Sequence, residues 1–248
     1  MNYIIDREKL REALELTALA SRNPTNQSGE FGNRDELLEV VLRIRSEISV
    51  AMLNWATVEA FNNNADALFD GLSRRIAGET ARFAIKALVR DVIACLMRIS
   101  DAPGTDRQSL CRLAKEFSAL SLDALVVRFG GLADDLNAAR SLFLASVPVD
   151  WTTQPEPVDG RLRELRTTFR PIRDVLIAHA LDYSNLELKR DIPKVREFLK
   201  LSSSLTDAAC IVCNVSRLNL QEHWDGAIAQ GTAFWDVFLA VDRKSKID

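Results

Sequence analysis

The sequence predicts an all-α protein, and three observations support this fold class. Apolar residues recur at spacings of three and four along several long stretches, which is typical of helices that bury one face. Glycine and proline are few, at 10 and 7 in 248 residues, and long stretches contain neither. No segment alternates apolar and polar residues in the way that a half-buried strand does. We therefore expect helices joined by polar connections and no β-sheet.

The composition is that of a globular protein without a strong charge bias. Apolar residues make up 47% of the chain and charged residues 27%, which are ordinary values for this class. The 32 basic and 35 acidic side chains give a formal net charge of -3. This balance does not indicate nucleic-acid binding, so any contact with a nucleic acid must come from a local basic patch.

A cytoplasmic location without a membrane partner is the expectation from the sequence. The first 30 residues contain Asp6, Glu8, Glu12 and Glu15, and they lack the uncharged apolar core of a signal peptide. No run approaches the roughly 18 apolar residues that a membrane-spanning helix needs.

The first 34 residues are predicted to form a separate N-terminal part. Asp6 to Ser21 has the pattern of a short amphipathic helix, and residues 22–34 have the composition of a polar linker. This part could pack back onto the chain or dock on a partner copy, and both alternatives stay open. We expect residues 35–248 to form one helical domain.

Two long helices are predicted at the start of this domain. The first begins at Asp35 and should break near the asparagine run 62–64, because asparagine is a poor helix former. The second runs from about Leu72 to Ile99 and is stopped by a Pro-Gly pair. Near its end, Arg98 and Asp101 are three residues apart, and the expected arrangement is an ion pair between them.

The rest of the domain is predicted to contain four further helices and an aromatic C-terminal segment. Two consecutive glycines separate the first two of these helices, and a proline-containing connection precedes the third. The predicted elements are helices at 109–129 and 132–147, the connection 148–160, a helix that follows Gly160, a helix that follows Pro193, and the segment with Trp224, Phe234, Trp235 and Phe238.

The helix after Gly160 contains the most informative stretch of the chain. His179 is one of only two histidines, and it continues a stripe of apolar residues with helical spacing, formed by Leu162, Leu165, Phe169, Ile172 and Leu176. Such a histidine is either a packed core residue or part of a site, and the spacing leaves both open. Arg173 lies six residues earlier, about 120° away around a helix. One straight helix therefore does not aim both side chains at one point. Three alternatives stay open: the long arginine side chain could curl round, a kink at Pro171 could change the approach, or two copies of the helix could share a site.

Arginines are concentrated in the same helix, at positions 161, 163, 166, 170 and 173. Arg166 and Arg173 are seven residues apart and should share a face. One interpretation is that they lie on the surface or pair with Glu164 and Asp174. The other is that they hold the phosphates of a nucleic acid, because the guanidinium fork matches phosphate oxygens.

Two segments resemble the HEPN superfamily, and in particular its abortive-infection (AbiU-like) type. The first is the stretch IRDVLIAHALD, with Arg173-Asp174, four further residues, His179 and then Asp182. The second is Ile93–Asp101, which is similar to an earlier helix of that group that ends in Arg-x-x-Asp. The resemblance covers about residues 35–225.

The resemblance implies a bundle of long antiparallel helices and an activity. Members of this superfamily are commonly metal-independent endoribonucleases of toxin–antitoxin or phage-defence systems, and they commonly pair two motif helices in a homodimer. It implies RNA as the substrate and neither a cofactor nor a metal. The residues carried over are Arg173, Asp174 and His179 as catalytic, Arg166 and Arg170 as RNA-binding, and Arg98, Asp101 and Asp182 as supporting.

The residue types fit metal-free cleavage of RNA. Histidine titrates near neutrality, which suits a proton transfer to or from the 2′-hydroxyl or the leaving 5′-oxygen. Arginine stays charged and can stabilise the negative charge that develops on the phosphorus oxygens. Asp174 would orient one of the two. The expected products are a 2′,3′-cyclic phosphate and a 5′-hydroxyl.

The alternative hypothesis is a catalytically silent helical interaction protein. It would bind a partner such as a nucleotidyltransferase-like antitoxin, and it would not need the complete arginine, aspartate and histidine pattern.

Cys210 and Cys213 do not favour a third function. A single CxxC is too little for a structural zinc site, and a redox motif would need a strand–helix context, so we expect two buried, small apolar residues.

Overall fold

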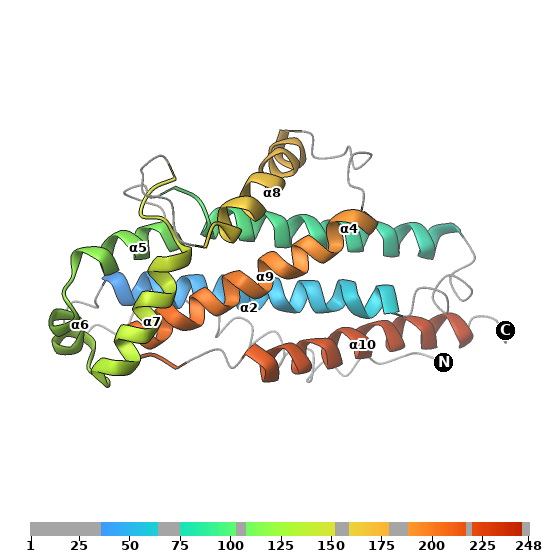
Figure 1. Ribbon diagram of the computed structural model, residues 1–248. Coiled ribbons are helices and arrows are strands. Elements are labelled where there is room, and N and C mark those ends of the chain that lie inside the picture. The colour runs from blue at the N-terminus through green and yellow to red at the C-terminus, as the bar shows by residue number, and fades with distance from the viewer. Residues whose placement is uncertain are drawn as a thin grey trace, which may run out of the picture. The chain divides into compact units, whose positions relative to one another are not determined.

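The computed structural model describes residues 36–63, 75–102, 108–151, 159–178, 188–216 and 220–244. The described ranges contain eight helices and no strand, which confirms the predicted all-α class (Figure 1). The chain divides into Met1–Asp35 and Glu36–Asp248, and every described residue belongs to the second unit. The predicted N-terminal helix and linker, with the boundary at residue 34, lie outside the described residues.

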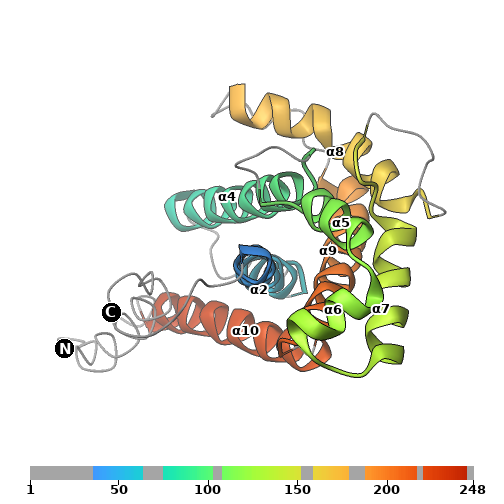
Figure 2. The same cartoon turned by 90° about the vertical axis from the view of Figure 1, so that its left-hand side faces the viewer.

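Helix α2 (Glu36–Asn63) forms the centre of the helical unit. It packs against α4 (Arg75–Ile99), α9 (Leu188–Val212) and α10 (Leu220–Lys244), and Figure 2 shows it almost end-on between these three helices. Its buried residues therefore lie on more than one side of the helix, and they include Ile44, Ile48 and the fully buried Trp55. A helix surrounded in this way needs apolar residues over much of its circumference.

The predicted single helix at 109–129 is wrong, because the structure has two helices there. They are α5 (Leu110–Ala119) and α6 (Leu122–Phe129). The Ser121 hydroxyl caps α6 by accepting a hydrogen bond from the Ala124 amide at 3.1 Å. Arg140 donates to the carbonyls of Phe117 and Leu120, both at 2.8 Å. These bonds satisfy carbonyls at the end of α5 that have no partner within the helix.

The predicted break at the two glycines is confirmed. Gly130 and Gly131 have φ angles of 73° and 94°, a region that side chains with a Cβ rarely adopt. Asn214 donates from its side-chain nitrogen to the Phe129 carbonyl at 3.0 Å and thereby joins the turn to the end of α9. Helix α7 (Ala133–Ser146) follows close to its predicted range.

One helix boundary differs from the prediction. Helix α9 begins at Leu188, before Pro193, rather than after it. Pro193 thus lies inside the helix, which continues through it although the proline nitrogen cannot donate a backbone hydrogen bond. The described part of α2 reaches Asn63, and a break after this point would lie outside the described residues. Phe83, an apolar residue of α4, has 59% of its surface exposed.

The contact between α10 and α2 is close enough to exclude a side chain at one position. A Cβ on Gly231 would lie 2.9 Å from the Cα of Thr57 and 3.0 Å from the Ala56 carbonyl oxygen. The indole of Trp235 donates to the Thr57 carbonyl at 2.9 Å, and its ring lies 4.9 Å from the ring of Phe61. The aromatic C-terminal segment thus supplies part of the core.

None of the helices in the described ranges has the length and apolarity needed to cross a membrane.

Candidate functional site

Helix α8 (Arg161–Ala178) carries the arginines of the candidate site. Leu162, Leu165 and Phe169 are buried, which confirms the first part of the predicted apolar stripe. Phe169 stacks on Phe198 of α9 with ring centroids 5.9 Å apart. Pro171 lies inside the helix and does not end it. Packing on one face therefore fixes the helix rotation and directs the arginines toward the end of α4.

Two arginines of α8 converge on one oxygen atom of Asp101. The Nη1 atom of Arg173 lies 3.3 Å from Oδ1 of Asp101, and the Nη2 atom of Arg166 lies 3.5 Å from the same oxygen. Asp101 lies two residues after Ile99, the last residue of α4. The side chains of Arg166, Arg173 and Asp101 are 15%, 21% and 21% exposed. The predicted shared face of Arg166 and Arg173 is thus confirmed, and it faces a carboxylate.

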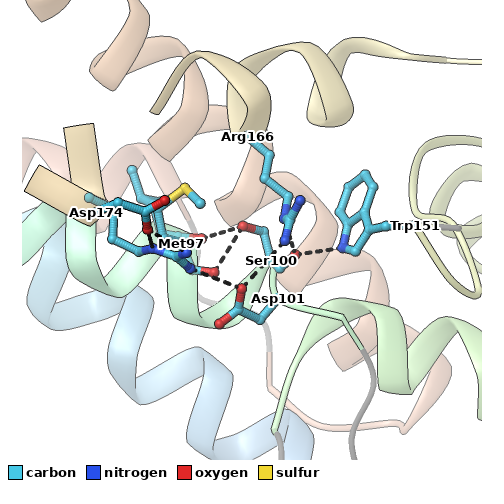
Figure 3. Close-up of polar contacts among 8 residues, drawn as sticks. Met97, Ser100, Asp101, Trp151, Arg166 and Asp174 are labelled. Atoms are coloured by element: carbon cyan, nitrogen blue, oxygen red, sulfur yellow. Dashed lines mark hydrogen bonds and ion pairs between the residues drawn. The ribbon is translucent and has the colours of Figure 1, made fainter. Parts of the chain in front are cut away.

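The backbone carbonyl of Ser100 anchors Arg166. It accepts a hydrogen bond from Nε of Arg166 at 3.1 Å and one from the indole nitrogen of Trp151 at 2.9 Å. Figure 3 shows Arg166 and Trp151 side by side above Ser100 and Asp101. The Arg166 guanidinium lies 4.8 Å from the centre of the Trp151 ring, within the range of a cation–π interaction. The orientation of Arg166 is therefore fixed by contacts other than Asp101.

Arg173 is anchored by its neighbour Asp174. Its Nε and Nη2 atoms donate to Oδ1 of Asp174 at 2.9 and 2.7 Å. Two arginines and two aspartates thus meet at the junction of α4 and α8, and their formal charges balance. We call the participating residues the Asp101 cluster: Ser100, Asp101, Trp151, Arg166, Arg173 and Asp174.

The predicted ion pair between Arg98 and Asp101 is wrong. Nε of Arg98 donates to Oε2 of Glu47 on α2 at 3.0 Å, whereas Asp101 pairs with α8. The two residues diverge because Asp101 lies beyond the end of the helix that carries Arg98. Arg98 and Glu47 instead line a surface hollow of about 370 Å³ between α2 and α4, together with Asn54 and Asp91.

The other predicted site residues are distributed as follows. Arg170 lies on α8 and is exposed. His179 and Asp182 lie outside the described residues, since the described part of α8 ends at Ala178. Arg161 pairs with Glu164 and with Glu197 of α9. The structure thus brings Arg166, Arg173, Asp174 and Asp101 together and separates Arg98 from them.

The site includes residues that the sequence did not reveal. Trp151 was predicted only as part of a connection, and the carbonyl of Ser100 has no signature in a sequence. Glu47 is separated from Arg98 by 51 positions, and no local spacing predicts such a pair. A tryptophan in a polar connection was the one available signal, because a large aromatic residue there usually packs against something.

The four cysteines are free and buried, which confirms the predicted burial of Cys210 and Cys213. Burial raises the pKa of Cys210 to about 11 and of Cys95 and Cys111 to about 12. At neutral pH these thiols are therefore protonated and poor nucleophiles.

In the part of the chain that the structure describes, no three His, Cys, Asp or Glu side chains gather as a metal site would require.

Comparison with known proteins does not extend these observations. No protein-family model, curated protein or solved structure matches the chain.

Proposed function

We propose that this protein is a metal-independent endoribonuclease of the HEPN type, acting in a toxin–antitoxin or phage-defence system. One observation carries the proposal. The two segments that resemble the family, Ile93–Asp101 and the stretch with Arg173, meet through the ion pair of Asp101 and Arg173, although these residues are 72 positions apart. A chance resemblance of two short segments would not require them to be in contact.

The proposed chemistry assigns a role to each residue of the motif. Arg173 would stabilise the charge that develops on the phosphate, because its guanidinium is permanently charged and is held in one orientation by Asp174. His179 would transfer a proton at the 2′-oxygen or the 5′-oxygen. Arg166 and the exposed Arg170 would contact the RNA backbone, with Asp182 and Arg98 as supporting residues. We propose that two copies of the chain pair their motif helices.

RNA cleavage by purified protein in EDTA tests this proposal. The wild type is compared with His179→Ala and Arg173→Ala, and Arg43→Ala is the matched control because Arg43 is an exposed arginine of α2. We expect cleavage by the wild type and by the control, and its loss in the other two variants, with the circular dichroism spectrum unchanged. Equal cleavage by the wild type and by His179→Ala would contradict the assignment.

A second candidate function is a non-enzymatic interaction protein, and the charge balance of the Asp101 cluster favours it. All three guanidinium nitrogens of Arg173 have a carboxylate partner, so a phosphate must compete with these carboxylates. Growth tests separate the two functions. Toxicity that persists in His179→Ala would indicate binding of a partner, such as an antitoxin-like protein, whereas toxicity that requires His179 would indicate cleavage.

A further inference from the structure

The positions of the two guanidinium groups around Asp101 are those of an anion site. Arg166 and Arg173 each direct one Nη atom at the same oxygen, Oδ1 of Asp101. Arginine pairs recognise a planar carboxylate and a tetrahedral phosphate in the same way, since each presents negatively charged oxygen atoms that accept hydrogen bonds. The Oδ1 atom therefore lies where a phosphate oxygen would bind between the two arginines.

The contacts of Asp101 are the weak ones in this cluster. Its distances of 3.3 and 3.5 Å to the two arginines exceed the 2.7–2.9 Å that is typical of a charge-assisted hydrogen bond. By contrast, Nε of each arginine is held more closely, at 3.1 Å by the Ser100 carbonyl and at 2.9 Å by Asp174. Removal of the Asp101 carboxylate would consequently leave both guanidinium groups in place.

We propose that Asp101 is an internal competitor that occupies a phosphodiester subsite formed by Arg166 and Arg173. The subsite is closed in the free protein and opens when an RNA phosphate displaces the Asp101 carboxylate. This device limits the affinity for RNA, because each binding event must break two ion pairs. The inference rests on the proposed function for the identity of the ligand, and it adds a regulatory contact to the same site.

Asp101→Asn tests the inference, because it removes the charge and keeps the shape and one acceptor oxygen. The probe is a fluorescent 2′-O-methyl RNA oligonucleotide, which cannot be cleaved through its 2′-oxygen, and binding is measured by anisotropy. We expect Asp101→Asn to bind about fivefold tighter than the wild type, since a partly exposed ion pair contributes up to about 1 kcal/mol. In the double variant Asp101→Asn with Arg166→Ala, the gain should be lost.

Asp91→Asn is the matched control. Asp91 is also on α4 and is 58% exposed, and its ion-pair distance to Arg90 is 3.7 Å. This substitution changes the net charge by the same amount without touching the Asp101 cluster, so binding should stay at the wild-type level. An equal gain in Asp91→Asn would overturn the inference, because the effect would then be one of overall charge. Equal or weaker binding by folded Asp101→Asn would overturn it as well.

A measurement on the wild type does not depend on the folding of a variant. Carbodiimide labelling of carboxylates, read by mass spectrometry, should modify Asp101 slowly in the free protein and faster with saturating oligonucleotide, with Asp91 as the internal reference. Labelling of Asp101 that does not rise would overturn the inference.

The failure of the inference is distinguishable from the failure of the proposed function. Tighter binding by Asp101→Asn without any cleavage of unmodified RNA would retain the phosphodiester subsite and reject the nuclease. Cleavage by the wild type without tighter binding by Asp101→Asn would retain the nuclease and reject the competitor role of Asp101.

Discussion

Arg173 and Asp101 are 72 positions apart in the sequence, and their side chains meet at 3.3 Å between α8 and the end of α4. This contact joins the two segments on which the proposed nuclease function rests. Arg166 contacts the same carboxylate oxygen through its Nη2 atom and donates from its Nε atom to the Ser100 carbonyl. The two arginines therefore differ in how strongly they are tied to the fold, and this difference has measurable consequences.

Arg166→Ala should destabilise the protein more than Arg173→Ala. Arg166 loses a hydrogen bond to a buried residue's carbonyl, an ion pair and its contact with Trp151, which together are worth about 2 kcal/mol. Arg173 loses ion pairs in a partly exposed position, worth under about 1 kcal/mol. Urea denaturation gives the free energies of unfolding. Equal losses would show that the Ser100 and Trp151 contacts add nothing.

Arg140→Ala should destabilise the junction of α5 and α6. The substitution removes both side-chain donors to the carbonyls of Phe117 and Leu120, at a cost of about 1–3 kcal/mol. Arg140→Lys is the matched variant, since it keeps the charge but loses the fork that reaches two carbonyls. We expect Arg140→Lys to fall between the wild type and Arg140→Ala in urea denaturation. A wild-type value for Arg140→Ala would contradict the capping role.

Gly231→Ala and Gly226→Ala should change stability in opposite directions, although both lie in α10. A Cβ at Gly231 would meet the backbone of α2 at 2.9 Å, whereas a Cβ at Gly226 would meet nothing within 4 Å. The first variant should lose about 1–3 kcal/mol to overpacking. The second should gain up to about 1 kcal/mol from helix propensity. Thermal unfolding of both variants checks the pair, and a gain in each would mean that the helices separate easily.

Because the thiols of Cys95 and Cys111 are buried, we expect the free energy of unfolding to fall at alkaline pH. Their pKa in the folded protein is about 12 for Cys95 and Cys111, above the ordinary value of 9.0, because burial disfavours the thiolate. The unfolded chain therefore releases protons first, so this contribution is complete below pH 9 and is lost between pH 9 and 12. At pH 10 the loss is about 1 kcal/mol per thiol.

Urea denaturation at pH 7, 9 and 10 measures this loss. Other groups titrate in the same range, so the informative quantity is the difference between the wild type and Cys111→Ala. We expect the variant to show a shallower fall between pH 9 and 10. Parallel curves for the two proteins would mean that the Cys111 thiol does not contribute.

Much of the fold could be predicted from the sequence, because helices bury one face and the apolar spacing records which face it is. The stripe of Leu162, Leu165 and Phe169 illustrates this agreement. The division of 109–129 into two helices could not be predicted, because the apolar pattern continues across it. The one local signal was Ser121, a residue type that favours the start of a helix, and the partner that stabilises the break is Arg140, from another helix.

The candidate site was predictable only in part, for a related reason. The spacing of Arg166 and Arg173 correctly predicted a shared face, since that depends on one helix alone. The pairing of these arginines with Asp101, and that of Arg98 with Glu47, depend on how α8 and α2 pack against α4. Local spacing suggested a pair of Arg98 and Asp101, and the tertiary contacts replaced it with two pairs to other helices.

The tight packing of Gly231 against α2 also indicates how the bundle would unfold in part. Helix α10 makes its extensive contacts with α2, while α4, α8 and α9 contact one another. Detachment of α10 would therefore leave those three helices together, a form of sub-global unfolding. The backbone amides of α10 should then exchange their hydrogens at a lower free energy than those of α2, and Trp235, released from its buried position, would report the event through its fluorescence.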